Sequence, residues 1–200
     1  MTEHSPASPP PARLRVFLAL WPGAATAAAL HARARALQAE CGGRAMRRDT
    51  IHLTLAFLGD VAVPRLAALG AVAQSVRGER FVLELDRVGS WRGNRILWSG
   101  CAQPPAALPA LAEALAAGLR AADFELEARA FNPHVTLVRN ALRPPQGIEM
   151  APLRWPVASF VLVASERNAG GAHYRVLGRW PLGDGGGGEA GEDAVAEPAR

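Results

Sequence analysis

The 200-residue sequence contains no lysine, only two cysteines and no long apolar run. Cys41 and Cys101 are far apart and show no metal-binding or redox spacing, so we expect free thiols and no disulfide scaffold. No apolar run is long enough to span a membrane. Half of the residues are nevertheless hydrophobic, which excludes a disordered chain and indicates one globular domain.

The absence of lysine makes every fixed positive charge an arginine, the residue best suited to bidentate contacts with phosphate. The alternative explanation is a GC-rich genome, which encodes arginine in place of lysine and would account for most of this bias. The formal net charge is +4, but residues 183–200 hold five carboxylates and one arginine, so residues 1–182 carry +8. Basicity alone favours a nucleic-acid partner only weakly.

The two ends of the chain differ in composition from the rest. Residues 1–12 are rich in Pro, Ser and Ala, and residues 183–200 are acidic and rich in Gly. We predict two disordered tails around a single domain of residues 13–182.

The start of that domain has some features of a signal peptide, because Arg13 and Arg15 precede the apolar run Val16–Leu20. Trp21-Pro22-Gly23 interrupts the run at once, and the segment is better explained as a buried strand. We therefore predict a cytoplasmic protein without a membrane segment.

The spacing of apolar residues and the positions of glycine and proline predict an α+β fold with mainly antiparallel pairing. The predicted order is strand, helix, strand, helix, hairpin, helix and three strands. The expected strands are Leu14–Leu20, Ile51–Leu58 (ending at Gly59-Asp60), the hairpin Phe81–Val88 with Arg95–Gly100, Pro133–Arg139, Val157–Ser165 and Tyr174–Trp180; the expected helices are Pro22 to about Glu40, Val63–Val76 and Pro105–Ala122.

One short segment occurs twice. Ile51-His-Leu-Thr-Leu recurs 82 residues later as Pro133-His-Val-Thr-Leu, although the chain has only five histidines and five threonines. Two His-x-Thr-Leu tetrapeptides would arise in about one shuffled chain in ten thousand of this composition. The repeat is therefore a functional signal.

Side chains alternate along a strand, so His52 and Thr54 share one face, as do His134 and Thr136. Histidine titrates near pH ~6.5, so two rings can serve as general acid and general base. A threonine hydroxyl donates a hydrogen bond to an anionic oxygen without adding charge. These groups suit the hydrolysis of a phosphodiester.

Three competing roles for the repeat have less support. A metal site needs a third ligand, which neither strand supplies nearby. A Ser or Cys nucleophile lacks its usual sequence context. A purely structural role is reasonable for one strand histidine, but not for the duplicated pair.

Several further side chains are candidates for substrate contact. By strict alternation Arg139 points away from His134, so a phosphate contact requires the strand to end or bulge there. Aromatic and arginine side chains near the hairpin turn suit single-stranded RNA, and one histidine opens the last strand. These candidates are Trp91, Trp98, Arg92, Arg95 and His173.

Taken together, the motifs resemble those of the 2H phosphoesterases, in particular the bacterial RNA 2′,3′-cyclic phosphodiesterases, also called 2′-5′ RNA ligases. The resemblance extends from about Leu14 to Leu182. It rests on Arg15-Val-Phe-Leu-Ala-Leu, Ile51-His-Leu-Thr-Leu-Ala-Phe-Leu-Gly-Asp, Arg95-Ile-Leu-Trp, Phe131-Asn-Pro-His-Val-Thr-Leu-Val-Arg and Tyr174-Arg-Val-Leu-Gly-Arg-Trp-Pro-Leu.

The resemblance implies a two-lobed pseudo-twofold fold, with sheets around a central cleft and helices outside. It assigns His52 as proton donor, His134 as proton acceptor, and Thr54 and Thr136 as phosphate-binding hydroxyls; Arg139 is a further candidate for substrate binding. It implies hydrolysis of an RNA 2′,3′-cyclic phosphate to a 2′-phosphomonoester, with no metal and no cofactor.

The expected partner is RNA with a 2′,3′-cyclic phosphate end, tRNA fragments included, bound by a monomer. Alternatives within the superfamily are 2′-5′ RNA ligation and hydrolysis of a small cyclic nucleotide. A non-catalytic RNA-end-binding module is the alternative from another class, although binding alone does not require an acid–base pair.

Overall fold

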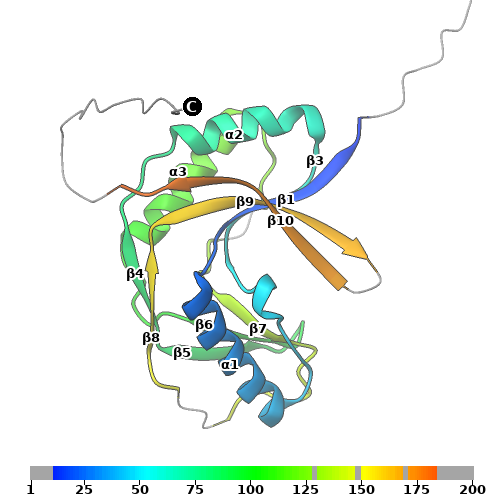
Figure 1. The fold of residues 1–200 in the computed structure, drawn as a ribbon, viewed down its shortest axis with the longest axis vertical. Helices are drawn as coiled ribbons and strands as arrows, with labels where there is room; N and C mark the ends of the chain where they lie inside the picture. Colours follow the sequence, from blue (N-terminus) through cyan, green and yellow to red (C-terminus); the bar gives the residue numbers. More distant parts are fainter. Residues whose placement is uncertain (1–10, 128–129, 147–149, 169–170, 184–200) are drawn as a thin grey trace, which may run out of the picture.

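The computed structural model describes residues 11–127, 130–146, 150–168 and 171–183, so the predicted tails 1–12 and 183–200 lie almost wholly outside the described residues. Within these ranges the chain forms the helices and strands that Figure 1 shows. The elements are β1 (Arg13–Leu20), α1 (Ala24–Cys41), β2 (Arg44–Ala45), η1 (Arg48–Thr50), β3 (Leu53–Ala62), η2 (Val63–Arg65), α2 (Leu66–Ser75), β4 (Phe81–Leu85), β5 (Arg87–Trp91), β6 (Ile96–Gly100), α3 (Ala107–Ala121), β7 (Val135–Arg139), β8 (Leu153–Val157), β9 (Ser159–Asn168) and β10 (Gly171–Pro181).

Most strands belong to one antiparallel sheet, in the order β10-β9-β1-β3-β7-β6-β5, with β2 beside β7. β4 and β8 form a separate antiparallel pair. The predicted α+β class with mainly antiparallel pairing is confirmed. The large sheet narrows where the pair Leu53–Val135 joins β3 to β7, which divides it into two halves.

The helices cover one face of this sheet. α2 and α3 pack together near β3 and β10, whereas α1 packs on β7 in the other half (Figure 1). Their buried leucines form one core with the inward side chains of β1, β3 and β7, which removes a large apolar area from water. In the described part of the chain, the opposite face of the sheet carries no α-helix and bears the polar side chains of the repeated motif.

β1 is a central strand, paired with β3 on one side and β9 on the other. Residues Val16–Leu20 are fully or almost fully buried, which explains their unbroken apolar character.

No helix among the described residues is long and apolar enough to cross a membrane.

The predicted end of the second strand at Gly59-Asp60 is wrong, because β3 continues to Ala62. Gly59 takes a left-handed backbone conformation (φ 68°) next to a register shift, and Asp60 stays paired with Arg15. A dipeptide typical of turns is therefore accommodated inside a strand as part of a bulge.

The predicted hairpin strand Phe81–Val88 is also wrong, because it is two strands that break at Asp86. The Asp86 carboxylate accepts a hydrogen bond from the backbone N–H of Ala102 at 2.7 Å. β5 alone forms the hairpin with β6, while β4 pairs with β8. Strand β8 was not predicted from the sequence; its Pro156 lacks a donor, which a strand tolerates at an edge, and β8 lies in a two-stranded sheet with β4.

Candidate active site

The two copies of the tetrapeptide meet where the sheet is narrowest, between β3 and β7. β3 and β7 are joined there by the antiparallel pair Leu53–Val135, the second motif residue of each copy. A local twofold axis therefore passes through this pair and relates one copy to the other. Both apolar side chains are buried, so the motif residues on either side of them point to the helix-free face.

Continuing this register by one residue sets each histidine across from the threonine of the other copy. His52 lies across from Thr136, and His134 lies across from Thr54. All four line a cavity of about 100 Å³, together with Arg139. The structure thus brings together all five residues that the sequence indicated for the site.

Arg139 reaches this cavity because β7 bulges. One step along β6 spans two residues of β7, from Thr136 to Val138, so Leu137 is the extra residue. Leu137 and Val138 are consequently both buried, and alternation resumes with Arg139 on the cavity face. Strict alternation would turn this arginine away from His134, so the predicted phosphate contact requires a bulge, and the structure has one here.

β3 bulges at the equivalent place. One step along β1 spans Thr54 to Ala56, which makes Leu55 the extra residue. Leu55 and Ala56 are both buried, and Phe57 returns to the cavity face. The local symmetry therefore extends beyond the tetrapeptide: the position after the bulge holds Phe57 in one copy and Arg139 in the other.

Both imidazole rings are oriented by the same backbone contact. Nδ1 of His52 lies 2.8 Å from the carbonyl oxygen of Thr50, and Nδ1 of His134 lies 2.8 Å from that of Asn132. Because a carbonyl oxygen only accepts, Nδ1 carries the proton in each neutral ring. Nε2 is left in each ring to accept or donate a proton in the cavity.

Burial lowers the pKa of both histidines below the ordinary value of 6.5. For His52 desolvation is the largest cause, and the positive charge of Arg139 adds to it, so the pKa falls to about 4. Desolvation and Arg139 also lower the pKa of His134. The hydrogen bonds to the backbone carbonyls oppose these effects without cancelling them, so both rings are neutral at pH 7 in the free protein.

Aromatic rings pack against both histidines and restrict their rotation. Trp91 lies edge-on to His134 with 4.4 Å between ring centroids. Three rings surround His52 at centroid distances of 4.8, 5.6 and 5.3 Å, namely Phe17, Trp21 and Tyr174.

The depressed pKa of His52 predicts an acid-sensitive stability. Its folded-state pKa of about 4 lies below the unfolded value of 6.5, so as pH falls the unfolded chain binds the proton first. The free energy of unfolding of the wild type should therefore drop more steeply than that of His52→Gln between pH 6.5 and 4, by up to roughly 3 kcal/mol in total. Urea unfolding at a series of pH values measures this, and parallel curves for the two proteins would contradict it.

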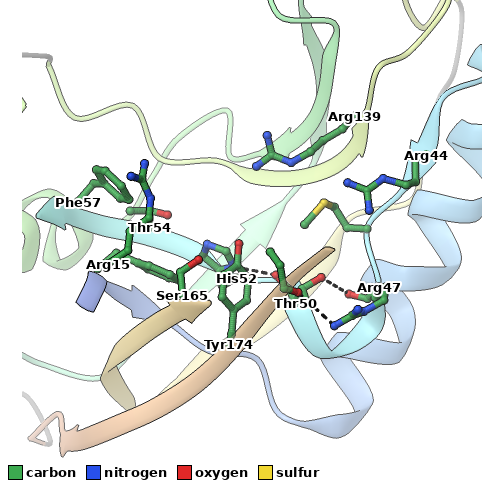
Figure 2. Close-up of a pocket in the computed structure, with 13 residues that line it drawn as sticks. Arg15, Arg44, Arg47, Thr50, His52, Thr54, Phe57, Arg139, Ser165 and Tyr174 are labelled. Carbon is green, nitrogen blue, oxygen red and sulfur yellow. Dashed lines mark hydrogen bonds between the residues drawn. The ribbon is translucent and has the colours of Figure 1, made fainter. Parts of the chain in front are cut away.

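A larger cavity of about 520 Å³ adjoins the small one and shares His52, Thr54 and Arg139 with it. Figure 2 shows His52 near the middle of this cavity, between an end that holds Phe57 (the aromatic end) and an end that holds Arg44 and Arg47 (the arginine end). At one end the guanidinium of Arg15 lies 4.7 Å from the ring centroid of Phe57. The other end holds Arg44 and Arg47.

Several residues of this larger cavity were not predicted to belong to the site. Two of them alternate along β1, which was identified only as a buried strand. Phe57 lies five residues after His52, as Arg139 lies five residues after His134, but this correspondence indicates a site residue only once the bulge is known. These residues are Arg15, Phe17, Arg44, Arg47, Phe57 and Tyr174.

The remaining candidates lie elsewhere. Trp91 and Arg95 line a separate cavity of about 170 Å³, and Trp91 also contacts the ring of His134. His173 is exposed, whereas its neighbour Tyr174 faces the large cavity. In the described part of the chain no three or more His, Cys, Asp or Glu side chains are grouped to hold a metal.

The geometry defines a class of site. Two imidazoles with free Nε2 atoms can move protons on either side of a bound group. Two hydroxyls and one guanidinium beside them can stabilise a developing negative charge on its oxygens. This is a general acid–base site for a phosphate ester.

Comparison with known proteins leads to the same class. The family model described as LigT-like phosphoesterase matches residues 20–98. The RNA 2′,3′-cyclic phosphodiesterase of Escherichia coli K12 is 38% identical over 144 residues, which cover 70% of this chain and 80% of that protein. A protein of the same name from Aeropyrum pernix is 33% identical over 94 residues, which cover 46% of this chain and 53% of that protein.

Solved structures share the fold over nearly their whole length. The E. coli LigT structure in its apo form superimposes with a TM-score of 0.74 at 34% identity, covering 86% of this chain and 99% of that one. The TT0787 protein of Thermus thermophilus gives a TM-score of 0.71 at 26% identity, covering 86% and 100%. The chain belongs to the LigT-like phosphoesterase family of the 2H superfamily, and the resemblance inferred from the paired tetrapeptides is confirmed.

Proposed function

We propose that the protein hydrolyses the 2′,3′-cyclic phosphate at the end of an RNA, releasing the 3′-oxygen and leaving a 2′-phosphomonoester. One observation carries the proposal: two imidazoles with free Nε2 atoms face one cavity from twofold-related strands. The names of the E. coli and A. pernix relatives, RNA 2′,3′-cyclic phosphodiesterase, support the same reaction.

In this proposal His134 is the general base and His52 the general acid. In an in-line displacement the attacking water and the departing 3′-oxygen lie on opposite sides of the phosphorus, and the nucleoside remains on the side of the departing oxygen. His52 lines both cavities, whereas His134 lines only the small one. The large cavity beside His52 has room for the nucleoside, which supports His52 as the proton donor.

The protons balance in this scheme. His134 takes a proton from water as the new O–P bond forms, and His52 gives one to the 3′-oxygen as the P–O3′ bond breaks. The free protein holds the pKa of His52 at about 4, mainly by burial. The negative cyclic phosphate opposes that effect and raises the pKa, so we infer that His52 takes up its proton with the substrate.

The threonines and Arg139 complete the site. Thr54 and Thr136 donate hydrogen bonds to the non-bridging oxygens from opposite strands, and Arg139 adds a positive charge beside both histidines. Such fixed donors stabilise the charge that builds on these oxygens in the transition state.

The alternatives receive less support. The names of the relatives do not favour 2′-5′ ligation or a small cyclic nucleotide over RNA hydrolysis. A non-catalytic RNA-end-binding module would not require two imidazoles with Nε2 free in one cavity. We further propose a cytoplasmic monomer acting on RNA ends, with tRNA fragments among the substrates.

The position of the phosphate in the product tests the proposal. An RNA with a 2′,3′-cyclic end should be converted to a 2′-phosphate product, with EDTA leaving the rate unchanged because the two imidazoles move the protons. Chromatography against 2′- and 3′-phosphate standards measures this. A 3′-phosphate product, or RNA bound without turnover, would overturn the assignment.

A further inference from the structure

The large cavity holds more positive charge than one phosphodiester requires. Its lining includes four arginines and, among the described residues, no carboxylate. A cyclic phosphodiester carries a single negative charge. The arginines are Arg15, Arg44, Arg47 and Arg139.

Three of the four have identifiable roles. Arg139 lowers the pKa of both histidines, so its charge acts where the scissile phosphate lies. Arg15 stacks on the ring of Phe57 at the aromatic end. Arg47 pairs with Asp49, with Nε 3.1 Å from the carboxylate, and its charge is thus balanced within the protein.

The positive charge of Arg44 is not balanced in this way. In the part of the chain that the structure describes, no hydrogen bond or ion pair engages its guanidinium, which Figure 2 shows directed into the cavity. Its Cα pairs with that of Arg139 across β2 and β7. Like charges directly opposite one another destabilise a sheet, so this arrangement favours an anion between or beside them.

The backbone holds Arg44 firmly in that position. The neighbouring Gly43 has φ 85°, and a Cβ there would lie 2.7 Å from the carbonyl oxygen of Arg139, so only glycine lets β2 approach β7 so closely. On the other side the N–H of Met46 donates to the carbonyl oxygen of Leu137 at 2.8 Å. The backbone that carries Arg44 is therefore fixed at the cavity wall, so on binding an anion only the exposed side chain loses freedom.

We propose that Arg44 binds a second phosphate of the substrate, the one on the 5′-oxygen of the terminal nucleotide. The inference rests on the proposed function, which places the cyclic phosphate between His52 and His134 and the nucleoside in the large cavity. The aromatic end near Phe57 then receives the base, and the arginine end receives the 5′-phosphate. In RNA this group is the phosphodiester to the preceding nucleotide, so Arg44 selects RNA ends over free nucleoside cyclic phosphates.

Three substrates test this inference: adenosine 2′,3′-cyclic phosphate with a 5′-hydroxyl, the same compound with a 5′-phosphate, and the dinucleotide ending in the cyclic phosphate. The wild type should show kcat/KM about 10- to 100-fold higher for one or both 5′-phosphorylated substrates, as expected for a charge-assisted contact. The substrate with the larger gain identifies a monoester or a diester as the preferred group.

Arg44→Gln should reduce that ratio to about one to three, because the contact is lost while the volume is largely kept. Arg120→Gln, which removes an equal charge from an exposed position on α3, should leave the ratio unchanged. A wild type without preference, or an Arg44→Gln protein that retains the full preference, would overturn the inference.

A binding measurement separates this inference from the proposed function. Calorimetry with adenosine 2′,5′-bisphosphate and adenosine 2′-phosphate requires no turnover. The bisphosphate should bind the wild type about 10- to 100-fold more tightly, and Arg44→Gln should abolish most of this difference. Equal affinities in the wild type would contradict the second phosphate site, whereas absence of hydrolysis with this binding pattern intact would contradict only the proposed reaction.

Discussion

Replacing His52 or His134 by alanine is expected to lower kcat for an RNA 2′,3′-cyclic phosphate by about 10²–10⁴-fold in each case. Each ring has one nitrogen held by a backbone carbonyl and the other free for the cavity, so among the described residues of the site no second group can take over its proton transfer. Single-turnover rates at saturating substrate measure the loss without a contribution from product release.

The exposed His173 supplies a matched control, and His173→Ala should retain the wild-type rate. The double variant should be only slightly slower than the slower single variant, because a paired acid and base act as a unit. Full activity in either single variant would refute the paired mechanism.

Replacing Arg139 by methionine is expected to lower kcat/KM by about 10²–10³-fold, the usual cost of losing one donor to a developing anion. It should also move the pH dependence. Arg139 lowers the pKa of both histidines, so its removal raises both values and shifts the profile of kcat/KM to higher pH. Rates measured from about pH 4 to about pH 9, which brackets both sides of a histidine titration, test both effects.

Arg120→Met provides the control, since Arg120 is exposed on α3, outside the lining of both cavities. Its pH profile should match that of the wild type. A loss of activity in Arg139→Met without any shift, or with a shift to lower pH, would mean that the arginine acts through the fold and not through its charge.

The catalytic pair was predictable because its signal is local. A histidine and a threonine two residues apart on a strand share a face whatever the rest of the fold does. Repetition of this pattern 82 residues later required only that two strands meet, and the pair Leu53–Val135 is where they do. The α+β class followed from the same periodicities.

The surroundings of the pair were less predictable, because bulges change which residues face the cavity. Leu55 and Leu137 are each an extra residue against the neighbouring strand, so Phe57 and Arg139 face the site against strict alternation. A bulge depends on the register of two strands, which a single strand sequence does not specify.

Other walls of the site come from elements whose partners are distant in sequence. Arg44 belongs to a two-residue strand that exists only because it pairs with β7, and Tyr174 reaches His52 through the pairing of β9 and β10 beside β1. Tertiary contacts override local propensity in these segments, as they also do for β8 with its Pro156.

The division of labour between the histidines can be tested most directly with a substrate whose leaving group needs no proton. In a 2′,3′-cyclic phosphorothiolate with sulfur at the 3′ position, the thiolate departs without a general acid. We predict that this substitution restores most of the rate of His52→Ala and none of the rate of His134→Ala, because the base is still required for water. Rescue of His134→Ala, or no rescue of either variant, would contradict the assignment of His52 as acid and His134 as base.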